Sequence, residues 1–353
     1  MKKSLLFING HLNVGGVERS LVNLLRSLDF DEYEVTLLLL EGEGDYIKEV
    51  PESVRIVLYD VSEAMGPLSV TLKRLIKEHK YSKFLFRLIF NASSRGINSA
   101  YRLFPKLAGM PSVFDAVIAY RPGICADVAA YGFKARNKLV WWHHGEINLS
   151  EKQIDGYKKC WRKFDKLITV TDGCKCMLMD CFCYGSNFID VIPNPIISAD
   201  LEEKASAESN VFGPAQDVLK LVSVGRLSPE KKFTAIPEIG RLLSASGTAY
   251  KWIVIGDGED RKEIERLITN YGLGNYIELK GALPNPYPYI KEADILVHPS
   301  PVESQGIVLL EALSLGTYCI ACDSIGARDV LKGKDGLITN DYNEIVRFIK
   351  SNY

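Results

Sequence analysis

The sequence predicts an α/β protein that contains two doubly wound parallel sheets in tandem. Short apolar runs alternate with stretches of helical spacing, and this alternation restarts after a polar stretch at residues 196–217. The 353 residues also suffice for about two domains. With 47% apolar residues, the composition excludes both a disordered chain and a disulfide-stapled mini-protein.

The first domain is predicted over residues 1–195. A buried strand at residues 4–9 ends at Gly10, and apolar residues then recur at helical spacing from Val17 to Leu28. Six further runs are predicted as strands, and helical stretches separate most of them: 34–40, 54–58, 116–119, 138–142, 166–171 and 190–192.

Residues 196–217 are predicted as a linker, and residues 218–353 as the second domain. Six strands are expected there, at 220–224, 251–255, 277–279, 295–298, 318–321 and 336–338. Helices are expected around residues 233–246 and 260–271. Because ligands of such sheets bind at the carboxyl ends of the strands, we expect the site in a cleft between the two domains.

Charge and hydropathy exclude several classes of protein. A net charge of −1 argues against a nucleic-acid binder, and no run of 18 apolar residues could span a membrane. The apolar run near the N-terminus is too short for a signal peptide, so a cytoplasmic protein with reduced cysteines is expected. Cys174-x-Cys176 and Cys181-x-Cys183 leave a zinc site as an alternative to free thiols.

Three loops at predicted strand ends carry residues suited to a phosphorylated ligand. Gly15 and Gly16 follow the first strand and open a helix, where unpaired N–H groups can bind an anion. Arg226 and Lys231 follow the first strand of the second domain, and two cations there suit a diphosphate. Taken alone, the first loop is more simply an ordinary turn and the second a solvated loop with surface charges.

The third loop lies between a strand ending at His298 and a helix starting near Ile307. It contains Glu303, and Glu311 follows inside the helix. Carboxylates accept hydrogen bonds from neighbouring hydroxyls, so the pair suits a ribose and a sugar. Two glutamates at this spacing also occur by chance.

Taken together, these motifs resemble the group 1 (family-four) retaining glycosyltransferases, which have the GT-B fold. The resemblance covers essentially the whole chain and is sharpest over residues 220–330. It is carried by Gly15-Gly16-x-Glu18, Gly225-Arg226 with Lys231, Gly256-Asp257-Gly258, Ala293-Asp294, Glu303-x7-Glu311, Leu315-Gly316-Thr317 and Asp323-Ser324-Ile325-Gly326.

The resemblance implies a nucleotide-diphosphate-sugar as donor substrate, with no cofactor and no metal. Arg226 and Lys231 would stabilise the leaving diphosphate. Glu303 would hold hydroxyls of the transferred sugar, and Glu311 those of the ribose. Further donor-binding positions would be Gly256, Gln305, Gly306 and Ile307.

From the first domain, the resemblance implies that Gly15 and Gly16 close on the diphosphate and that a histidine faces the sugar. His144 matches that histidine better than His143. The implied reaction retains the anomeric configuration and is driven mainly by charge stabilisation and positioning. Asp29-Phe30-Asp31 resembles a metal motif of other glycosyltransferases, but it is interpreted as a surface helix end.

The sequence departs from the family pattern at several positions. Lys232 stands where glycine is usual, Asp329 where glutamate is common, and Pro195-Ile196 follow Asn194 in place of Gly-Val-Asp. The family's closing helix, which crosses back onto the first domain, is not expected after residues 343–350.

Residues 61–113 hold nine basic and two acidic residues. A helix that begins after Gly66-Pro67 and extends to Ile89 would present Lys73, Lys77, Lys80 and Arg87 along one face. Such a helix could lie on an anionic membrane or simply pack on the sheet. With the family resemblance, it predicts peripheral membrane contact and a glycan or lipid-linked acceptor.

Three other functions stay open at this point. A GT-B nucleotide-sugar epimerase would use the same diphosphate site without an acceptor. A protein that only binds a nucleotide or carbohydrate would keep the fold without turnover. A glycoside phosphorylase would need pyridoxal phosphate, for which no suitable lysine context is found.

Overall fold

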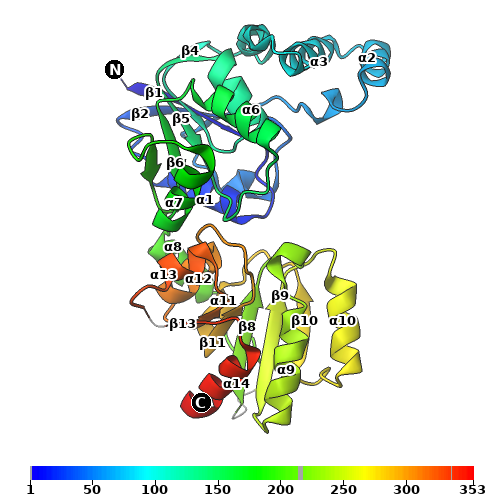
Figure 1. Ribbon diagram of the computed structural model, residues 1–353, viewed down its shortest axis with the longest axis vertical. Helices are drawn as coiled ribbons and strands as arrows, with labels where there is room; N and C mark the ends of the chain where they lie inside the picture. The colour runs from blue at the N-terminus through cyan, green and yellow to red at the C-terminus, as the bar shows by residue number, and fades with distance from the viewer. Residues whose placement is uncertain (1, 214–217, 335) are drawn as a thin grey trace. The chain divides into compact units, whose positions relative to one another are not determined.

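The computed structural model describes residues 2–213, 218–334 and 336–353. They form two compact units, each built on its own parallel sheet (Figure 1). The first unit contains residues 1–143, 147–170 and 175–195, whereas the second contains 144–146, 171–174 and 196–353. The predicted class, two parallel-sheet α/β domains in tandem, is confirmed.

The first sheet has seven strands in the order β3-β2-β1-β4-β5-β6-β7, and every neighbouring pair is parallel. Its strands are β1 Lys3–Asn9, β2 Tyr33–Leu39, β3 Arg55–Leu58, β4 Val113–Ala119, β5 Lys134–Trp141, β6 Lys166–Thr169 and β7 Ile189–Val191. All seven strands predicted for residues 1–195 are present, with ends shifted by a few residues.

Both faces of the first sheet are covered. Leu6 and Ile8 point to one apolar cluster and Phe7 to another, as the two-residue repeat of a strand requires. One face packs against α1 Gly16–Arg26. The other face is covered by segments that include α2 Leu68–Lys77, α3 Tyr81–Ser94, α4 Phe104–Leu107, α5 Ile124–Asp127, α6 Glu151–Trp161 and α7 Asp172–Phe182.

Short helical segments connect these elements: η1 Asp45–Glu49, η2 Ser62–Ala64, η3 Asn98–Leu103 and η4 Val128–Gly132. Helix η4 is a π-helix, and the Lys138 ammonium donates to the carbonyls of Ala129, Ala130 and Phe133 around its end. Burial lowers the pKa of Lys138 to about 8.

The single helix predicted from Gly66-Pro67 to Ile89 is wrong: α2 and α3 are separate helices. His79 adopts a left-handed conformation (φ 55°), and the Lys80 N–H donates to the Leu75 carbonyl. This is the hydrogen-bond pattern that closes a helix with a left-handed residue, where glycine is usual. Figure 1 shows α2 at the outer edge of the first unit.

The break changes which basic side chains are exposed. Lys73 and Lys77 are exposed on α2. Lys80 forms ion pairs with Glu63 at 2.7 Å and Glu78 at 3.1 Å. Arg87 is buried and donates to the Gly66 carbonyl at 2.7 Å, so it is not available to a membrane surface.

The second sheet has six parallel strands in the order β10-β9-β8-β11-β12-β13. They are β8 Leu219–Val224, β9 Tyr250–Ile255, β10 Ile277–Gly281, β11 Ile295–His298, β12 Tyr318–Ala321 and β13 Gly336–Ile338. All six are predicted by the sequence. The order reverses between β8 and β11, which in such sheets is where ligands bind.

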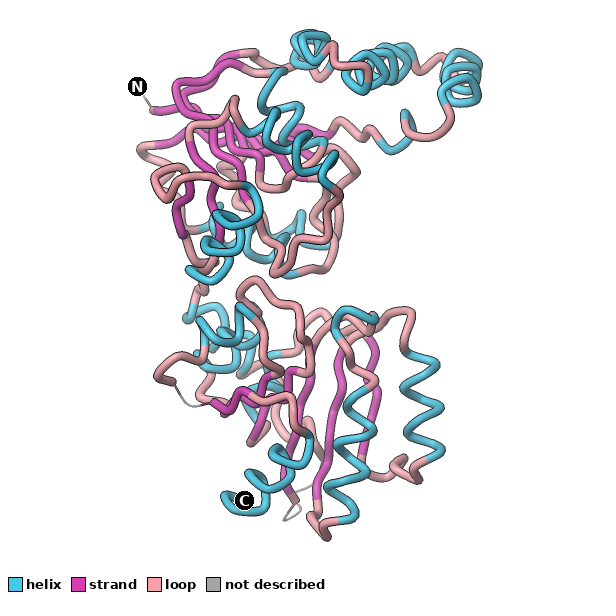
Figure 2. Tube along the Cα trace, viewed as in Figure 1, coloured by secondary structure: helices cyan, strands magenta, loops and turns pink. Residues whose placement is uncertain are grey.

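Helices cover both faces of the second sheet (Figure 2). One face packs against α9 Ala235–Ala245, α10 Arg261–Asn270 and α14 Tyr342–Asn352. The other packs against α8 Ser198–Ala205, α11 Tyr287–Glu292, α12 Ile307–Ser314 and α13 Ile325–Val330.

The linker predicted at 196–217 is wrong in part, because it contains α8. Leu201 and Ala205 lie four residues apart on α8 and are buried in the core of the second unit, as is Phe212. The polar residues around them face solvent and conceal this packing in the sequence. Residues 214–217 lie outside the described residues.

Candidate active site

The loops that follow β8 and β9 support the two predicted cations. Gly256 has φ 143°, and a Cβ atom there would lie 1.8 Å from the Gly225 carbonyl oxygen. The Leu227 N–H also donates to the Asp257 carbonyl at 3.0 Å. These backbone contacts explain Gly256-Asp257-Gly258 as a support for the loop that carries Arg226 and Lys231.

The two cations of this loop differ in their surroundings. Arg226 is exposed. Lys231 ends the short helix η5 Pro229–Lys231, and its ammonium donates to Glu303 Oε1 at 2.6 Å. The structure therefore brings together Lys231 and Glu303, which stand 72 residues apart.

Glu303 is a buried carboxylate, with 11% of its side chain exposed. His298 Nε2 lies 2.8 Å from the same oxygen, Oε1. Burial alone would raise the pKa of Glu303, but His298 and Lys231 together lower it to about 2. The Glu303 side chain is therefore ionised at neutral pH, and it can accept hydrogen bonds but not donate them.

Backbone contacts fix the loop around Glu303. The Gly326 N–H donates to the Glu303 carbonyl at 2.9 Å, and Thr171 Oγ1 donates to the Ser304 carbonyl at 2.8 Å. A Cβ atom on Gly145 would lie 2.4 Å from the Glu303 carbonyl group. Residues 144–146 and 171–174 accordingly group with the second unit.

The donor-binding positions predicted after Glu303 form the start of α12. Gln305 is buried, Gly306 is the left-handed cap residue (φ 73°), and Ile307 is the first helical residue. Glu311 lies one turn further on and is buried, and the Tyr287 hydroxyl donates to its Oε1 at 2.9 Å. Glu303 and Glu311 are therefore both held in fixed positions on either side of one helix start.

Lys232 and Asp329 are two of the departures from the family pattern. Lys232 adopts the left-handed conformation (φ 53°) that glycine adopts most readily. Asp329 accepts a hydrogen bond from the Gly173 N–H at 2.8 Å. Lys232 and Asp329 thus both stand where the backbone of the second unit is constrained, the first by its own conformation and the second by a hydrogen bond.

In the first unit, Gly15 and Gly16 lie at the start of α1, as predicted from the sequence. Glu18 in the first turn is buried, pairs with Arg121 and lies 3.8 Å from His11 Nδ1. Ser20 on α1 contacts the Tyr120 hydroxyl and donates to Asn194 Oδ1 at 2.7 Å.

The two neighbouring histidines lie in different surroundings. His143 is buried, and its ring centroid lies 4.7 Å from that of Tyr120. His144 is exposed, and its carbonyl accepts from the Cys174 thiol at 3.8 Å. Of the two, His144 groups with the unit that contains Glu303.

The alternative zinc motif lies on α7 and just after it, and the D-x-D motif lies in an exposed turn. All eight cysteines are free thiols; Cys174 on α7 is buried whereas Cys176 is exposed. Asp29 and Asp31 are exposed in a turn after α1. Within residues 2–213, 218–334 and 336–353, no three His, Cys, Asp or Glu side chains are placed to share a metal ion.

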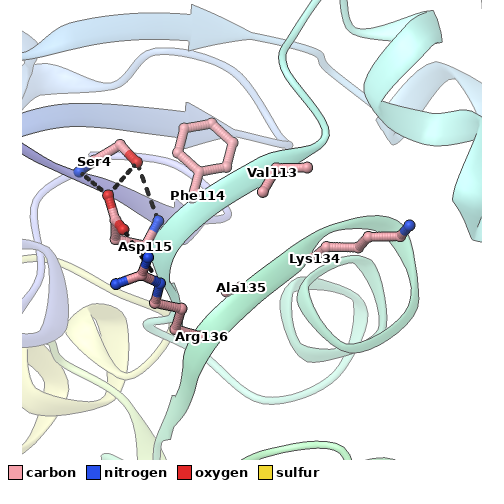
Figure 3. Close-up of a pocket in the computed structure, with 7 residues that line it drawn as sticks. All are labelled: Ser4, Val113, Phe114, Asp115, Lys134, Ala135 and Arg136. Carbon is pink, nitrogen blue, oxygen red and sulfur yellow. Dashed lines mark hydrogen bonds and ion pairs between the residues drawn. The ribbon is translucent and has the colours of Figure 1, made fainter.

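A cavity of about 330 Å³ lies beside the central strands of the first sheet (Figure 3). Its lining includes Ser4, Asp115 and Arg136, close to the amino ends of β1, β4 and β5. The Asp115 carboxylate already has partners there, because it accepts hydrogen bonds from the Ser4 amide and hydroxyl. The cavity is thus unrelated to the predicted strand-end site.

Sequence reasoning missed two residues of the site, His298 and Tyr287. His298 is the last residue of a predicted strand, so the rule that strand ends carry function could have identified it. Tyr287 could not be identified in this way, because its contact with Glu311 spans 24 residues and joins two helices.

The fold of the chain is similar to that of known proteins. The chain can be superimposed on HepE from Anabaena, solved in complex with UDP, with a TM-score of 0.69 and 17% identity over 99% of this chain and 89% of HepE. The amylovoran biosynthesis glycosyltransferase AmsD of Erwinia amylovora is 23% identical over 98% of this chain and 88% of AmsD. These similarities and the two parallel sheets show the GT-B fold that the sequence predicts.

The model of the family "Glycosyl transferases group 1" matches residues 205–350. The GPI3 subunit of phosphatidylinositol N-acetylglucosaminyltransferase from Saccharomyces cerevisiae is 27% identical over 47% of this chain, and the match spans only 37% of that subunit. Over residues 205–350 the chain is thus similar to the group 1 glycosyltransferases.

No helix in the described ranges combines the length and the apolar character needed to cross a bilayer.

Proposed function

We propose that this protein is a retaining, metal-independent glycosyltransferase that uses a nucleotide-diphosphate-sugar. The observation that carries the proposal is the buried Glu303 carboxylate, which Lys231 contacts beside the start of α12. An ionised carboxylate accepts sugar hydroxyls, the adjacent cations offset diphosphate charge, and the helix start offers N–H groups.

Each residue has a role in this proposal. Arg226 and Lys231 stabilise the departing diphosphate, which is where negative charge develops in the transition state. Glu303 holds the transferred sugar, and Glu311 holds the ribose. Gly256, Gln305, Gly306 and Ile307 complete the donor site in the second unit, where His144 also belongs and would face the sugar. Gly15 and Gly16, at the start of α1, would contact the diphosphate.

The acceptor proposed is a glycan or a lipid-linked oligosaccharide of a cell-surface polymer. Support comes from the name of AmsD, a polysaccharide biosynthesis enzyme whose similarity extends over nearly the whole chain. The yeast relative acts on a phosphatidylinositol lipid by name, but it matches less than half of this chain. We place the protein on the cytoplasmic side of the membrane.

Product analysis tests the reaction. The purified protein is incubated with a panel of nucleotide-sugars, UDP-sugars first because HepE binds UDP, with and without lipid-linked and polysaccharide acceptors. Mass spectrometry should show a sugar-extended acceptor, and NMR of the anomeric proton should show retention. Activity should survive a metal chelator.

The same assay separates the alternatives. An altered sugar released without any acceptor would identify an epimerase. Binding of nucleotide-sugars without turnover, under all acceptor conditions, would indicate a protein that only binds them. Either result would overturn the proposed transfer reaction.

Peripheral membrane contact is the second part of the proposal, and the structure changes the residues that support it. Seven exposed apolar side chains lie on α2, on α3 and in the segment that ends with η3: Val70, Ile76, Tyr81, Leu85, Leu88, Ile97 and Leu103. Tyr81, Leu85 and Leu88 are spaced i, i+4 and i+7, so they form one exposed stripe on α3. We call these seven residues the apolar surface.

Exposed basic side chains accompany the apolar surface: Lys73, Arg74, Lys77, Arg95 and Arg102. Apolar residues next to cations match the headgroup region of an anionic bilayer, where each Lys or Arg contributes about 1 kcal/mol. An anionic lipid surface is therefore the partner proposed for α2 and α3.

Vesicle flotation tests the membrane proposal. Binding is expected to vesicles that contain phosphatidylglycerol and to weaken in neutral vesicles or in high salt. Lys73→Glu with Lys77→Glu should abolish flotation, whereas the matched reversal of exposed Lys332 and Lys334 in the second unit should not. Equal flotation of both double variants would overturn this part of the proposal.

A further inference from the structure

His298 is a buried histidine at the carboxyl end of β11, and 3% of the residue is exposed. Its Nε2 atom lies 2.8 Å from Glu303 Oε1. Because an ionised carboxylate only accepts hydrogen bonds, the Nε2 atom must carry the hydrogen. The other ring nitrogen, Nδ1, is buried and has no hydrogen-bond partner among the residues that the structure describes.

The two oxygens of Glu303 have different partners. Oε1 accepts from both His298 and Lys231, the latter at 2.6 Å. No residue in the described ranges donates to Oε2. One oxygen of this carboxylate is thus committed to the protein, and the other is left to accept from a ligand.

The two donors to Oε1 differ in how firmly they are held. His298 belongs to β11, which pairs with β8 on one side and β12 on the other, and its carbonyl accepts from the Cys322 N–H at 2.9 Å. Lys231 extends from a loop helix, and 27% of its flexible side chain is exposed. A lysine placed in this way can move toward a diphosphate, whereas the histidine ring cannot.

We infer that His298 is a positioning residue that fixes the Glu303 carboxylate through Oε1, so that Oε2 accepts a hydroxyl of the transferred sugar. It keeps this orientation when Lys231 turns from Glu303 to the donor diphosphate. The inference rests on the proposed function, and it assigns to His298 a role that acts only through Glu303.

Kinetics and binding test this role with two variants. His298→Phe keeps the ring volume but removes the donor, and it should lower kcat/KM for the nucleotide-sugar by about 10- to 100-fold. Binding of the nucleoside diphosphate alone should change less than about twofold, because Glu303 contacts only the sugar. His298→Gln, which keeps an N–H donor, should recover most of the loss.

A double-mutant cycle separates positioning from general structural support. In a Glu303→Gln background, His298→Phe should add less than about a twofold loss, because its partner is already changed. Full additivity of the two losses would overturn the inference. So would an equal loss of nucleoside diphosphate binding in His298→Phe at an unchanged thermal midpoint.

A spectroscopic measurement makes the test independent of activity. The chain has five histidines, so the ring nitrogens can be resolved in a ¹⁵N NMR spectrum. A protected Nε2–H signal should be present in the wild type, absent in His298→Phe and shifted in Glu303→Gln. If the signal behaves in this way but no sugar is transferred, the proposed function fails while the contact stands. If the signal does not respond to Glu303→Gln, the positioning role itself fails.

Discussion

Lysine side chains have different surroundings in the two units. In the second unit, Lys231 contacts a largely buried carboxylate, and 27% of the lysine side chain and 11% of the glutamate side chain are exposed. In the first unit, Lys73 and Lys77 are exposed beside apolar side chains on a surface helix. Burial strengthens an electrostatic interaction, whereas exposure lets salt and water weaken it. The number of lysines in a segment therefore does not predict their role; the burial and the partners of each lysine do.

The largest expected effect comes from removing the partly buried cation. Lys231→Ala should lower kcat/KM by about 10²- to 10³-fold, the usual loss when one group that stabilises transition-state charge is deleted. Steady-state kinetics with the preferred nucleotide-sugar would measure it. The neighbouring Lys232→Ala is the matched control, since Lys232 is exposed and is assigned no role in the site. A similar kcat/KM for Lys231→Ala and Lys232→Ala would contradict the role assigned to Lys231.

Acid sensitivity should follow the buried carboxylate. The folded-state pKa of Glu303, about 2, lies below its ordinary value of 4.5, so its contribution to stability is full above pH 4.5 and is lost as the pH falls toward 2. This contribution is about 3 kcal/mol by linkage. The urea midpoint of the wild type should therefore fall between pH 5 and pH 3, because Glu303 of the unfolded chain binds a proton near its ordinary pKa while Glu303 of the folded protein stays ionised until about pH 2.

Glu303→Gln removes that titration, so its midpoint should fall less over the same range. Glu263→Gln is the control, because Glu263 forms an exposed pair with Arg266 on α10 and its pKa is also lowered by that pair. Parallel acid transitions of the wild type and Glu303→Gln would contradict the assignment.

A smaller effect is expected where a lysine occupies a glycine conformation. Lys232→Gly should raise the free energy of unfolding by about 1 kcal/mol, because a residue with a Cβ atom is strained at φ 53°. Lys232→Ala should give no such gain, since alanine keeps the strain. Urea titration of the wild type, Lys232→Gly and Lys232→Ala would show whether backbone strain or the lysine side chain determines the free energy of unfolding.

The smallest effect on stability is expected for the exposed apolar side chains of α3. Leu85→Ser with Leu88→Ser should change the free energy of unfolding by no more than about 0.5 kcal/mol for each site, because neither side chain is buried in the core. The same variant should lose vesicle binding. Ile89→Ala, which affects the adjacent buried residue, should cost about 2–5 kcal/mol. A large destabilisation by the serine variant would mean that the apolar surface is covered within the protein.

The sequence predicts the strands well because most are short apolar runs, and those in the middle of a sheet, such as β1 and β11, are largely buried. It predicts the residues of the second-unit site through their positions at strand ends, and the structure brings Lys231 and Glu303 into contact. It fails where one residue decides the backbone: His79 closes α2 without the glycine that would have signalled the break. It also fails where partners are distant, since neither the Arg87–Gly66 contact nor the Tyr287–Glu311 contact leaves a local pattern.

The loop that carries Glu303 has a consequence for how such an enzyme can diverge. The loop is held by the backbone of Gly326 and by the close approach of Gly145, not by the side chains of its own exposed or half-buried residues, Pro301 and Val302. Substitutions at those two positions can therefore accumulate without moving the carboxylate. A mutant library at Pro301 and Val302 should therefore vary the surface of the loop while the Glu303 carboxylate stays in place.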